Sequence, residues 1–233
     1  MIEQFPASAD PDRPFIIVMS AVTLDGKMTV KRGVTSGSLG AYVTPNIVDF
    51  LHAARASVDA VMVGGTTIVV DNPSLTVRTI EGRNPIRIVV DPEGAVPLDA
   101  KIFHDKQAPT IVAVAEETPV ERVNVLRDLD VNVIVAGAGR YVDIKELMKA
   151  LTVQGVKSLL VEGGATLNWL VISAGVVDEL RIIKVPIVTG ERGAPSFTEA
   201  PGGSNPDNPL KMECKEVRTV GNCVVLYCKR VSE

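Results

Sequence analysis

The chain of 233 residues lacks the features that mark several common protein classes. No run of lysine and arginine exceeds two residues and the net charge is −4, which argues against an extended nucleic-acid-binding face. No apolar stretch reaches the roughly 18 residues that a membrane span needs. Residues 1–14 are polar and contain proline, without the basic start and apolar block of a signal peptide. We therefore expect a cytoplasmic protein that binds neither nucleic acid nor membrane.

Cysteine is scarce, and two common nucleotide-binding signatures are missing. Cys214, Cys223 and Cys228 are odd in number and widely spaced, so we expect reduced packing residues rather than a disulfide framework or a zinc site, and no metal. The chain contains neither a G-x-G-x-x-G motif nor a Walker A motif. An ordinary Rossmann or P-loop protein is therefore excluded.

What is present is an ordinary globular balance, with 46% hydrophobic and 22% charged residues. Apolar runs of strand length occupy residues 15–19, 60–63, 86–90, 110–115, 131–135 and 158–161. Helix-like segments follow several of them, at residues 45–56 after a Thr44-Pro45 start signal and at 120–129, 143–151 and 166–173. Because the runs do not alternate with polar residues, we predict a mostly parallel, twisted sheet flanked by helices on both faces.

The last third of the chain has a different pattern. Residues 177–185, 213–220 and 223–230 resemble longer strands, and Gly221-Asn222 predicts a hairpin between the last two. Residues 189–209 are rich in glycine and proline, which predicts a long exposed loop. We expect a single α/β domain at residues 14–233, preceded by an extension at residues 1–13, with a mixed sheet and an antiparallel hairpin at one edge.

The most informative stretch is Glu162-Gly-Gly-Ala-Thr166, here named the second elbow, at the end of the apolar run 158–161. A helix is expected to begin at Ala165 or Thr166. Free N–H groups at a helix N-terminus attract phosphate, and glycine has no Cβ to keep a bulky anion away. A glycine pair after a strand is equally typical of a plain tight turn.

Gly64-Gly65, here named the first elbow, repeats this pattern after the run 60–63. Thr66 or Thr67 is expected to cap a short helix that Pro73 ends. Ligands of open α/β sheets bind beyond the carboxyl ends of the strands. Two elbows at such ends are what a dinucleotide cleft requires.

Four motifs carry a resemblance to a known family. They are Thr23-Leu-Asp-Gly-Lys27, Gly65-Thr-Thr with Asp71-Asn-Pro-Ser-Leu-Thr-Val-Arg78, Asn84-Pro-Ile-Arg-Ile-Val-Val-Asp91 and Glu162-Gly-Gly-Ala-Thr166. In this order and spacing the chain resembles the riboflavin-pathway reductases, whose fold is similar to dihydrofolate reductase. It is most similar to the stand-alone archaeal 2,5-diamino-6-ribosylamino-4(3H)-pyrimidinone 5′-phosphate reductases. The H-x-E and P-C-x-x-C motifs of the deaminase that bacterial relatives carry are missing.

The resemblance implies an NAD(P)H-dependent reduction of the ribosylamino group to ribitylamino, with NADPH as cofactor and NADH as the alternative. Residues implied to bind the cofactor are Thr67, Asp71, Asp91, Gly139, Gly163, Gly164, Ala165 and Thr166. Residues implied to bind the phosphorylated pyrimidine are Lys27, Arg55, Leu75, Arg78 and Glu162. Those implied in catalysis are Lys27, Asp71 and Glu162.

The chemistry of these residue types suits the substrate, although each has a plainer interpretation. Arginine binds phosphate bidentately, and a carboxylate accepts hydrogen bonds from the N–H groups of a diaminopyrimidinone. Helix capping would equally explain Thr67 and Asp71, and a turn would explain Asp91. Surface or helix-end charge would explain Lys27, Arg55 and Arg78. Glu162 ends a buried strand and needs a partner in any case.

The chain departs from the family pattern at two places, and its two histidines have no predicted catalytic role. Where relatives carry a basic residue after a serine, this chain has Ser36-Gly-Ser-Leu-Gly-Ala-Tyr-Val-Thr44, so phosphate anchoring there is in question unless Lys31 or Arg32 compensates. Glu93 would repel a 2′-phosphate, and Arg140 would offset it. His52 is expected to be structural, and His104, after a strand-like segment, to lie on the surface.

Two other functions stay open. One is a reductase of the same fold that acts on a pterin-like or secondary-metabolite substrate, which the altered Ser36 stretch motivates. The other is a nucleotide-binding protein that has lost catalysis. The resemblance also implies a homodimer, for which residues 177–185 and 223–227 are candidate interface strands.

Overall fold

A computed structural model describes residues 3–202 and 209–231 of the chain. The strands are β1 (Phe15–Thr23), β2 (Ala60–Gly64), β3 (Ile86–Val90), β4 (Thr110–Val114), β5 (Asn132–Val135), β6 (Ser158–Gly163), β7 (Glu179–Val185), β8 (Met212–Val220) and β9 (Cys223–Arg230). The helices are a 3₁₀-helix η1 (Ser36–Tyr42) and the α-helices α1 (Pro45–Ala56), α2 (Gly65–Asp71), α3 (Lys101–His104), α4 (Val120–Asp128), α5 (Ile144–Val153) and α6 (Ala165–Ser173). The strands form one sheet in the order β5-β4-β3-β2-β6-β1-β7-β9-β8.

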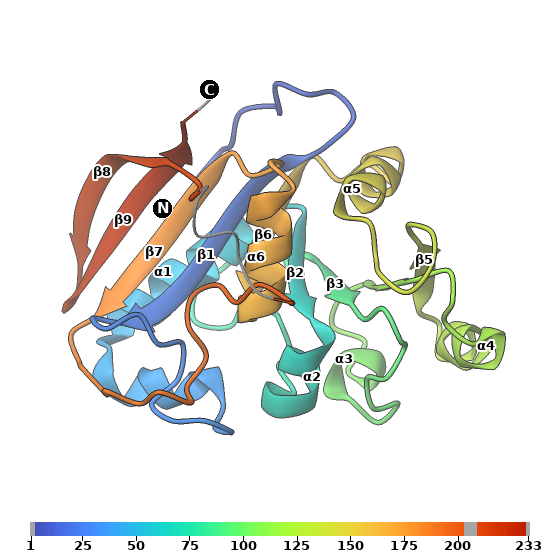
Figure 1. The fold of residues 1–233 in the computed structure, drawn as a ribbon, viewed down its shortest axis with the longest axis horizontal. Coiled ribbons are helices and arrows are strands. Elements are labelled where there is room, and N and C mark those ends of the chain that lie inside the picture. Colours follow the sequence, from blue (N-terminus) through green and yellow to red (C-terminus); the bar gives the residue numbers. More distant parts are fainter. Residues whose placement is uncertain (1–2, 203–208, 232–233) are drawn as a thin grey trace.

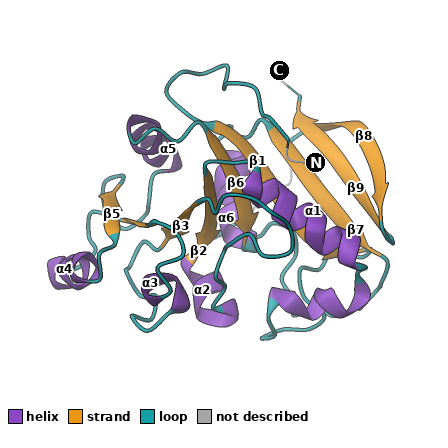
Figure 2. Ribbon diagram, turned by 180° about the vertical axis from the view of Figure 1, so that it is seen from behind, coloured by secondary structure: helices purple, strands orange, loops and turns teal. Residues whose placement is uncertain are grey.

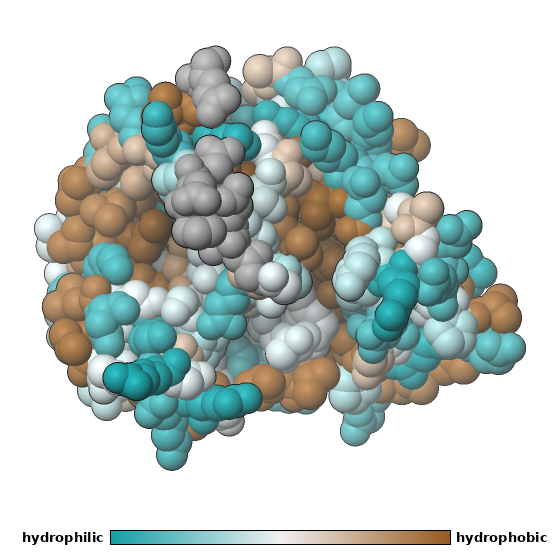
Figure 3. Space-filling view, in the orientation of Figure 1, coloured by the Kyte–Doolittle hydropathy of each residue, from teal (hydrophilic) through white to brown (hydrophobic). Residues whose placement is uncertain are grey.

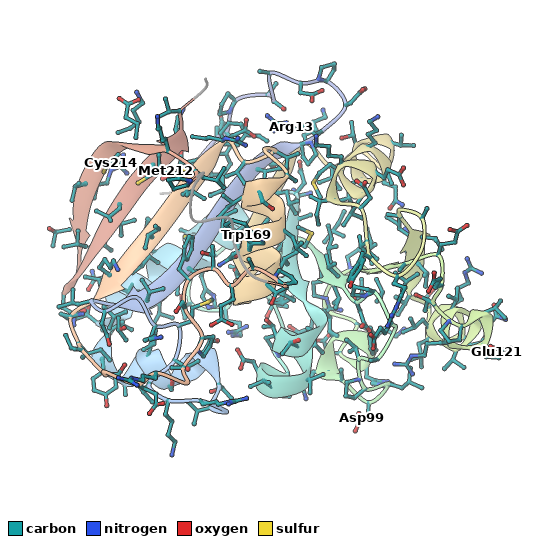
Figure 4. The ribbon with its side chains drawn as sticks, in the orientation of Figure 1. Arg13, Asp99, Glu121, Trp169, Met212 and Cys214 are labelled. Carbon is teal, nitrogen blue, oxygen red and sulfur yellow. The ribbon has the colours of Figure 1, made fainter. Side chains whose placement is uncertain are left out.

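The sheet is parallel from β5 to β7, and its last two neighbour pairs, β7–β9 and β9–β8, are antiparallel. This confirms the predicted mixed sheet with a hairpin at one edge, where Gly221 turns the chain with a φ of 57°. In Figure 1 the hairpin forms the red edge of the sheet. The exposed Cys214 and the half-buried Met212 mark its outer strand in Figure 4. Cys223 and Cys228 are buried packing residues as expected, whereas the expectation for Cys214 was wrong.

Two hydrophobic layers hold the sheet between helices, as Figures 1 and 2 show from opposite sides. Alternate residues of β1 point into each layer: Ile17 and Met19 pack in one, Ile16 and Val18 in the other. Buried side chains of α1 to α4 line the first layer, and those of α5 and α6 line the second. Because both faces of the strands are covered, the strands are apolar without alternation, as the sequence indicated.

The predicted helices are confirmed with small shifts at their ends. Helix α1 begins at Pro45, although the Thr44 hydroxyl makes no capping hydrogen bond. Asp143 caps α5 by accepting from two backbone N–H groups. None of the helices that the structure describes has the length and apolar character needed to cross a membrane.

Two local expectations were wrong, and one short helix was not predicted. Helix α2 begins at Gly65, one residue before the expected threonine cap, because the extended Gly64 is already its N-cap. The stretch before His104 is the short helix α3 rather than a strand. The Ser36 stretch folds as η1, which the sequence pattern did not indicate. Of the predicted loop at 189–209, residues 203–208 lie outside the described part, and the remainder contributes an isolated bridge between Lys27 and Ser196.

Candidate active site

Three hollows meet at the carboxyl ends of the parallel strands. The central hollow, about 270 Å³, lies between α2, α6 and the loop at residues 195–199. The outer hollow, about 410 Å³, shares Gly64, Thr66, Thr166 and Leu167 with it. The inner hollow, about 230 Å³, lies against η1 and α1 and shares Met28, Ser36 and Glu162 with it. The three therefore form one groove beyond the strand ends, where α/β sheets bind ligands.

Glu162, at the end of β6, lies where the inner and central hollows meet. Its two carboxylate oxygens accept hydrogen bonds from Arg55 Nε at 2.6 Å and Nη2 at 2.7 Å. The two side chains are 13% and 14% exposed. Burial disfavours the Arg55 cation, but the charge of Glu162 and its hydrogen bonds outweigh this and raise the pKa of Arg55. The carboxylate predicted to need a partner thus has a bidentate one, from a helix more than a hundred residues away in sequence.

The second elbow turns directly after this pair. Gly163 has a φ of +97°, and a Cβ there would lie 3.1 Å from Met28 Cε and 3.3 Å from Asn168 Oδ1. Gly164 is the N-cap of α6 and offers no side chain to cap it. The first N–H groups of α6 are therefore left to other acceptors at the wall of the central hollow. In Figure 4, where Trp169 marks α6, the helix stands in front of the sheet with its N-terminal end toward these hollows.

The first elbow meets the second through a side chain. Thr67 Oγ1 accepts a hydrogen bond of 3.2 Å from Gly164 N–H. Asp71, at the end of α2, accepts from the backbone N–H of Ser36 at 3.2 Å and from its hydroxyl. Thr67, Asp71 and Ser36 all line the central hollow. The two residues expected from this elbow are thus brought to the groove, and Asp71 ties α2 to η1.

The outer hollow contains the residues expected at the far end of the cofactor. The buried Asp91 carboxylate accepts from Val96 N–H at 2.8 Å, so Asp91 holds its own turn while also lining the hollow. Glu93, Arg140 and Tyr141 line it too. Gly139 does not line this hollow, and its N–H donates to Glu116 at 3.2 Å.

Arg78 lies close to the Arg55–Glu162 pair. Its Nη1 donates to Thr76 Oγ1 at 3.0 Å and to Thr76 O at 3.3 Å, and the same carbonyl accepts from Arg55 Nη1 at 3.0 Å. Burial and then the positive charge of Arg55 lower the pKa of Arg78. Among the described residues Arg78 makes no ion pair, so this cluster carries more positive than negative charge.

Five of the expected residues line none of the three hollows: Lys27, Leu75, Arg78, Gly139 and Gly163. The Lys27 ammonium donates to Ala194 O at 3.2 Å and to Ser196 Oγ at 3.3 Å, so it supports the loop whose Pro195 lines the central hollow. Leu75 is 2% exposed, packs in the first hydrophobic layer and lines none of the three hollows. Its φ of 53° is unusual for a leucine.

The loop that closes the central hollow is fastened from several sides. Asn168, fully buried on α6, donates to Phe197 O at 2.9 Å, and Glu199 N–H donates to Ala165 O at 3.2 Å. The Asp25 carboxylate accepts from Gly190 N–H at 2.8 Å, and its hydrogen bonds with Thr23 and Gly190 lower its pKa. The Thr23-to-Lys27 motif and the Thr189-Gly190 turn thus form one unit.

Sequence reasoning missed Asn168 and Tyr141, whereas His52 is buried and accepts a backbone hydrogen bond, as expected of a structural residue. Asn168 is a buried polar side chain on a helix, and its position on an apolar face was the available signal. Tyr141 is 76% exposed beside Arg140, and its sequence neighbourhood contains nothing that distinguishes it. No group of three His, Cys, Asp or Glu side chains that could hold a metal is found in residues 3–202 and 209–231.

Comparisons with known proteins agree with this architecture. The model of the family described as "RibD C-terminal domain" matches residues 14–226. The 2,5-diamino-6-ribosylamino-4(3H)-pyrimidinone 5′-phosphate reductase of Aquifex aeolicus is 41% identical, over 88% of this chain and 91% of that protein. The protein of the same name from Methanothermobacter thermautotrophicus is 35% identical, over 92% and 97%. The structure of Acinetobacter baumannii RibD superposes with a TM-score of 0.76 at 22% identity, and this chain covers 58% of its length.

Proposed function

This chain belongs to the RibD C-terminal domain family, and we propose that it is the riboflavin-pathway reductase that converts 2,5-diamino-6-ribosylamino-4(3H)-pyrimidinone 5′-phosphate into its ribitylamino product. The observation that carries the proposal is the continuous groove, in which a hollow between two glycine elbows opens at Glu162 into a second hollow. Such a groove suits a reaction between a dinucleotide and a small substrate.

The residues of the two elbows fit a nicotinamide dinucleotide, and we propose NADPH. A Cβ on Gly163 or Gly65 would lie within 3.3 Å of neighbouring side-chain atoms, so both glycines let the elbows pack closely against those side chains. The uncapped N-terminus of α6 would hold the pyrophosphate, with Gly164, Ala165 and Thr166 around it. Thr67 and Asp71 would contact the nicotinamide half, and the outer hollow would take the adenosine half.

The substrate would occupy the inner hollow. Apolar side chains of β1, η1 and α1 contribute to its lining, and the Arg55–Glu162 pair lies at its end toward the central hollow. The lone pairs that Glu162 does not give to Arg55 can accept N–H groups of the diaminopyrimidinone. Arg78 supplies a guanidinium without a carboxylate partner for the 5′-phosphate.

The cofactor supplies the hydride, and this chain supplies position and electrostatics. Glu162 and Arg55 fix the substrate base at the boundary between the two hollows. The loop held by Lys27 and Asn168 covers the central hollow and limits the access of water. Asp71 and Ser36 hold α2 against η1, which fixes the position of the central hollow relative to the inner hollow.

The test of this proposal is turnover by the purified protein. We expect NADPH absorbance to fall when the diamino substrate is added, and the product to gain two hydrogen atoms by mass spectrometry. NADPH binding without turnover would disprove the proposed function. Turnover of a pterin-like substrate instead would favour the second candidate, a reductase of the same fold, for which the absence of a basic residue in η1 is the supporting observation.

The cofactor preference has its own test in the outer hollow. Glu93 and Arg140 both line it, so a 2′-phosphate placed there would meet charges of both signs. Glu93→Lys should raise the preference for NADPH over NADH by roughly tenfold, because it replaces a repulsion by an attraction. Arg140→Ala should lower the same ratio. If neither variant changes it, the 2′-phosphate does not bind in this hollow.

We also propose a homodimer that uses the hairpin edge. In Figure 3 apolar side chains gather over β8 and β9, where Val217 and Val224 are exposed. The outer side of β8 has no neighbouring strand in the described sheet, and such an edge is open to pairing. Size-exclusion chromatography with light scattering should give a mass of two chains, and a monomer would disprove this assembly.

A further inference from the structure

His52 joins α1 to the segment that carries Arg78. It lies one turn before Arg55 on α1 and is 4% exposed. Its Nδ1 accepts a hydrogen bond of 2.7 Å from Arg78 N–H and a longer one of 3.3 Å from Thr79 N–H. Both donors are backbone groups, so Nδ1 must be unprotonated and the proton of the neutral ring lies on Nε2.

The same segment is fixed on its other side by guanidinium groups. Thr76 O accepts from both Arg55 and Arg78, and Thr76 Oγ1 accepts from Arg78. The Arg78 side chain is thereby directed by two attachments: its backbone N–H on His52 and its guanidinium on Thr76. Only the first of these depends on a group that titrates near neutral pH.

We propose that His52 is a positioning residue for phosphate recognition: the neutral ring fixes the backbone of Arg78 so that its guanidinium faces the 5′-phosphate of the substrate. The inference rests on the proposed function, because it takes the phosphate from that substrate. Its role is to hold Arg78, and it does not contact the reacting atoms.

The charges around His52 favour its neutral form. Burial, and then the positive charges of Arg55 and Arg78, lower the pKa of His52, while Glu162 and Asp49 oppose this more weakly. Protonation would place an N–H on Nδ1, directed at two N–H donors. Since the folded-state pKa lies below the ordinary value of 6.5, the unfolded chain binds the proton first, and stability falls as pH drops below that value.

Two substitutions separate this role from simple packing. His52→Leu removes the acceptor, whereas His52→Asn places a side-chain oxygen near the position of Nδ1. His52→Leu should raise the KM for the phosphorylated substrate by roughly tenfold, the effect of one lost hydrogen bond on an equilibrium. Its KM for the dephosphorylated substrate and its Kd for NADPH should stay at the wild-type values. In His52→Asn the KM for the phosphorylated substrate should return most of the way to the wild-type value.

The other histidine provides the matched control. His104 is exposed on α3, where its Nε2 contacts Leu98 O at 2.8 Å, and among the described residues its ring makes no hydrogen bond to the Arg78 segment. His104→Leu should leave the ratio of the two KM values unchanged. An unchanged ratio in His52→Leu would overturn the inference, provided that the wild-type protein turns over the substrate. No turnover by wild type would instead overturn the proposed function.

A measurement without substrate covers the case in which His52→Leu does not fold. In the wild-type protein, ¹⁵N NMR of the ring should show His52 as the neutral Nε2–H tautomer at neutral pH. The protection factors of the Arg78 and Thr79 amides, which correct for slower intrinsic exchange at lower pH, should fall as His52 takes up a proton. The inference would be overturned if the ring carried a proton on Nδ1 at neutral pH. It would also be overturned if the protection of these amides did not change when His52 is protonated.

Discussion

The two glycine elbows occupy equivalent places after the paired strands β2 and β6, yet they need glycine to different degrees. Gly163 adopts a φ of +97°, which side chains rarely allow, and has a neighbour 3.1 Å from an added Cβ. Gly64 has a φ of −79°, and the nearest atom to an added Cβ there is 3.8 Å away. Only the second elbow requires glycine for its backbone conformation.

The two elbows differ in their need for glycine because they position different groups. The second elbow places a paired carboxylate, Glu162, and an uncapped helix N-terminus within one turn of chain. The first elbow starts a short helix that carries Thr67 and Asp71 to the same groove. The sharper turn therefore belongs to the elbow at which substrate and cofactor would meet, and the gentler one to a helix that supports it.

The largest effect is expected at the charge that only the second elbow carries. Glu162→Ala leaves the Arg55 guanidinium buried without its carboxylate, and should lower the free energy of unfolding by about 3 kcal/mol and abolish turnover. Urea denaturation measures the first effect. The double variant Arg55→Ala with Glu162→Ala should lose less stability than the sum of the single variants, and additive losses would contradict a coupled pair.

An intermediate effect is expected from adding a methyl group to each elbow. Gly163→Ala should lower the free energy of unfolding by about 1–3 kcal/mol, because alanine is strained at this φ and crowds Met28 and Asn168. Gly64→Ala is the matched control. Its gain in unfolded-state entropy and its poorer capping nearly offset each other, so it should change stability by less than about 0.5 kcal/mol. Equal losses in thermal unfolding would remove the distinction between the elbows.

The smallest effect is expected at the hydrogen bond between the elbows. Thr67→Val removes the acceptor of Gly164 N–H and should cost about 1 kcal/mol of stability, with a severalfold weaker NADPH affinity. Thr66→Val is the control, since Thr66 also lines the central hollow but makes no hydrogen bond to the second elbow among the described residues. Fluorescence titration with NADPH distinguishes the two. Equal affinities would show that the contact between the elbows does not shape the cofactor site.

Much of the fold was predictable because its elements are long apolar runs with clear start signals. Ile86–Val90 and Pro45–Ala56 match their predicted bounds, since the apolar composition of the strand and the Thr-Pro start of the helix are local signals. The helices η1 and α3 were missed because each is short and has no strong periodicity. Gly64 as the cap of α2 was missed because glycine gives no side-chain signal for that role.

Of the thirteen residues that the sequence indicated for the site, eight line the groove, and the contacts among them were not predictable. The sequence indicated that Glu162 needs a partner, but not that Arg55 supplies it across more than a hundred residues. Nor did it show that the Lys27 ammonium contacts Ala194 rather than the groove, or that Leu75 packs in the core. These outcomes depend on tertiary distances, which local pattern does not encode.

Isotope labelling can follow the hydride from the cofactor to the substrate. If the two elbows hold the nicotinamide in the central hollow with the substrate beside Glu162, NADPH deuterated at one face of the nicotinamide C4 should transfer its deuterium to C1′ of the ribityl chain. Turnover in heavy water with ordinary NADPH should leave that carbon-bound position unlabelled. Solvent deuterium at C1′, or transfer from both faces of the cofactor, would contradict a groove that fixes the two reactants against each other.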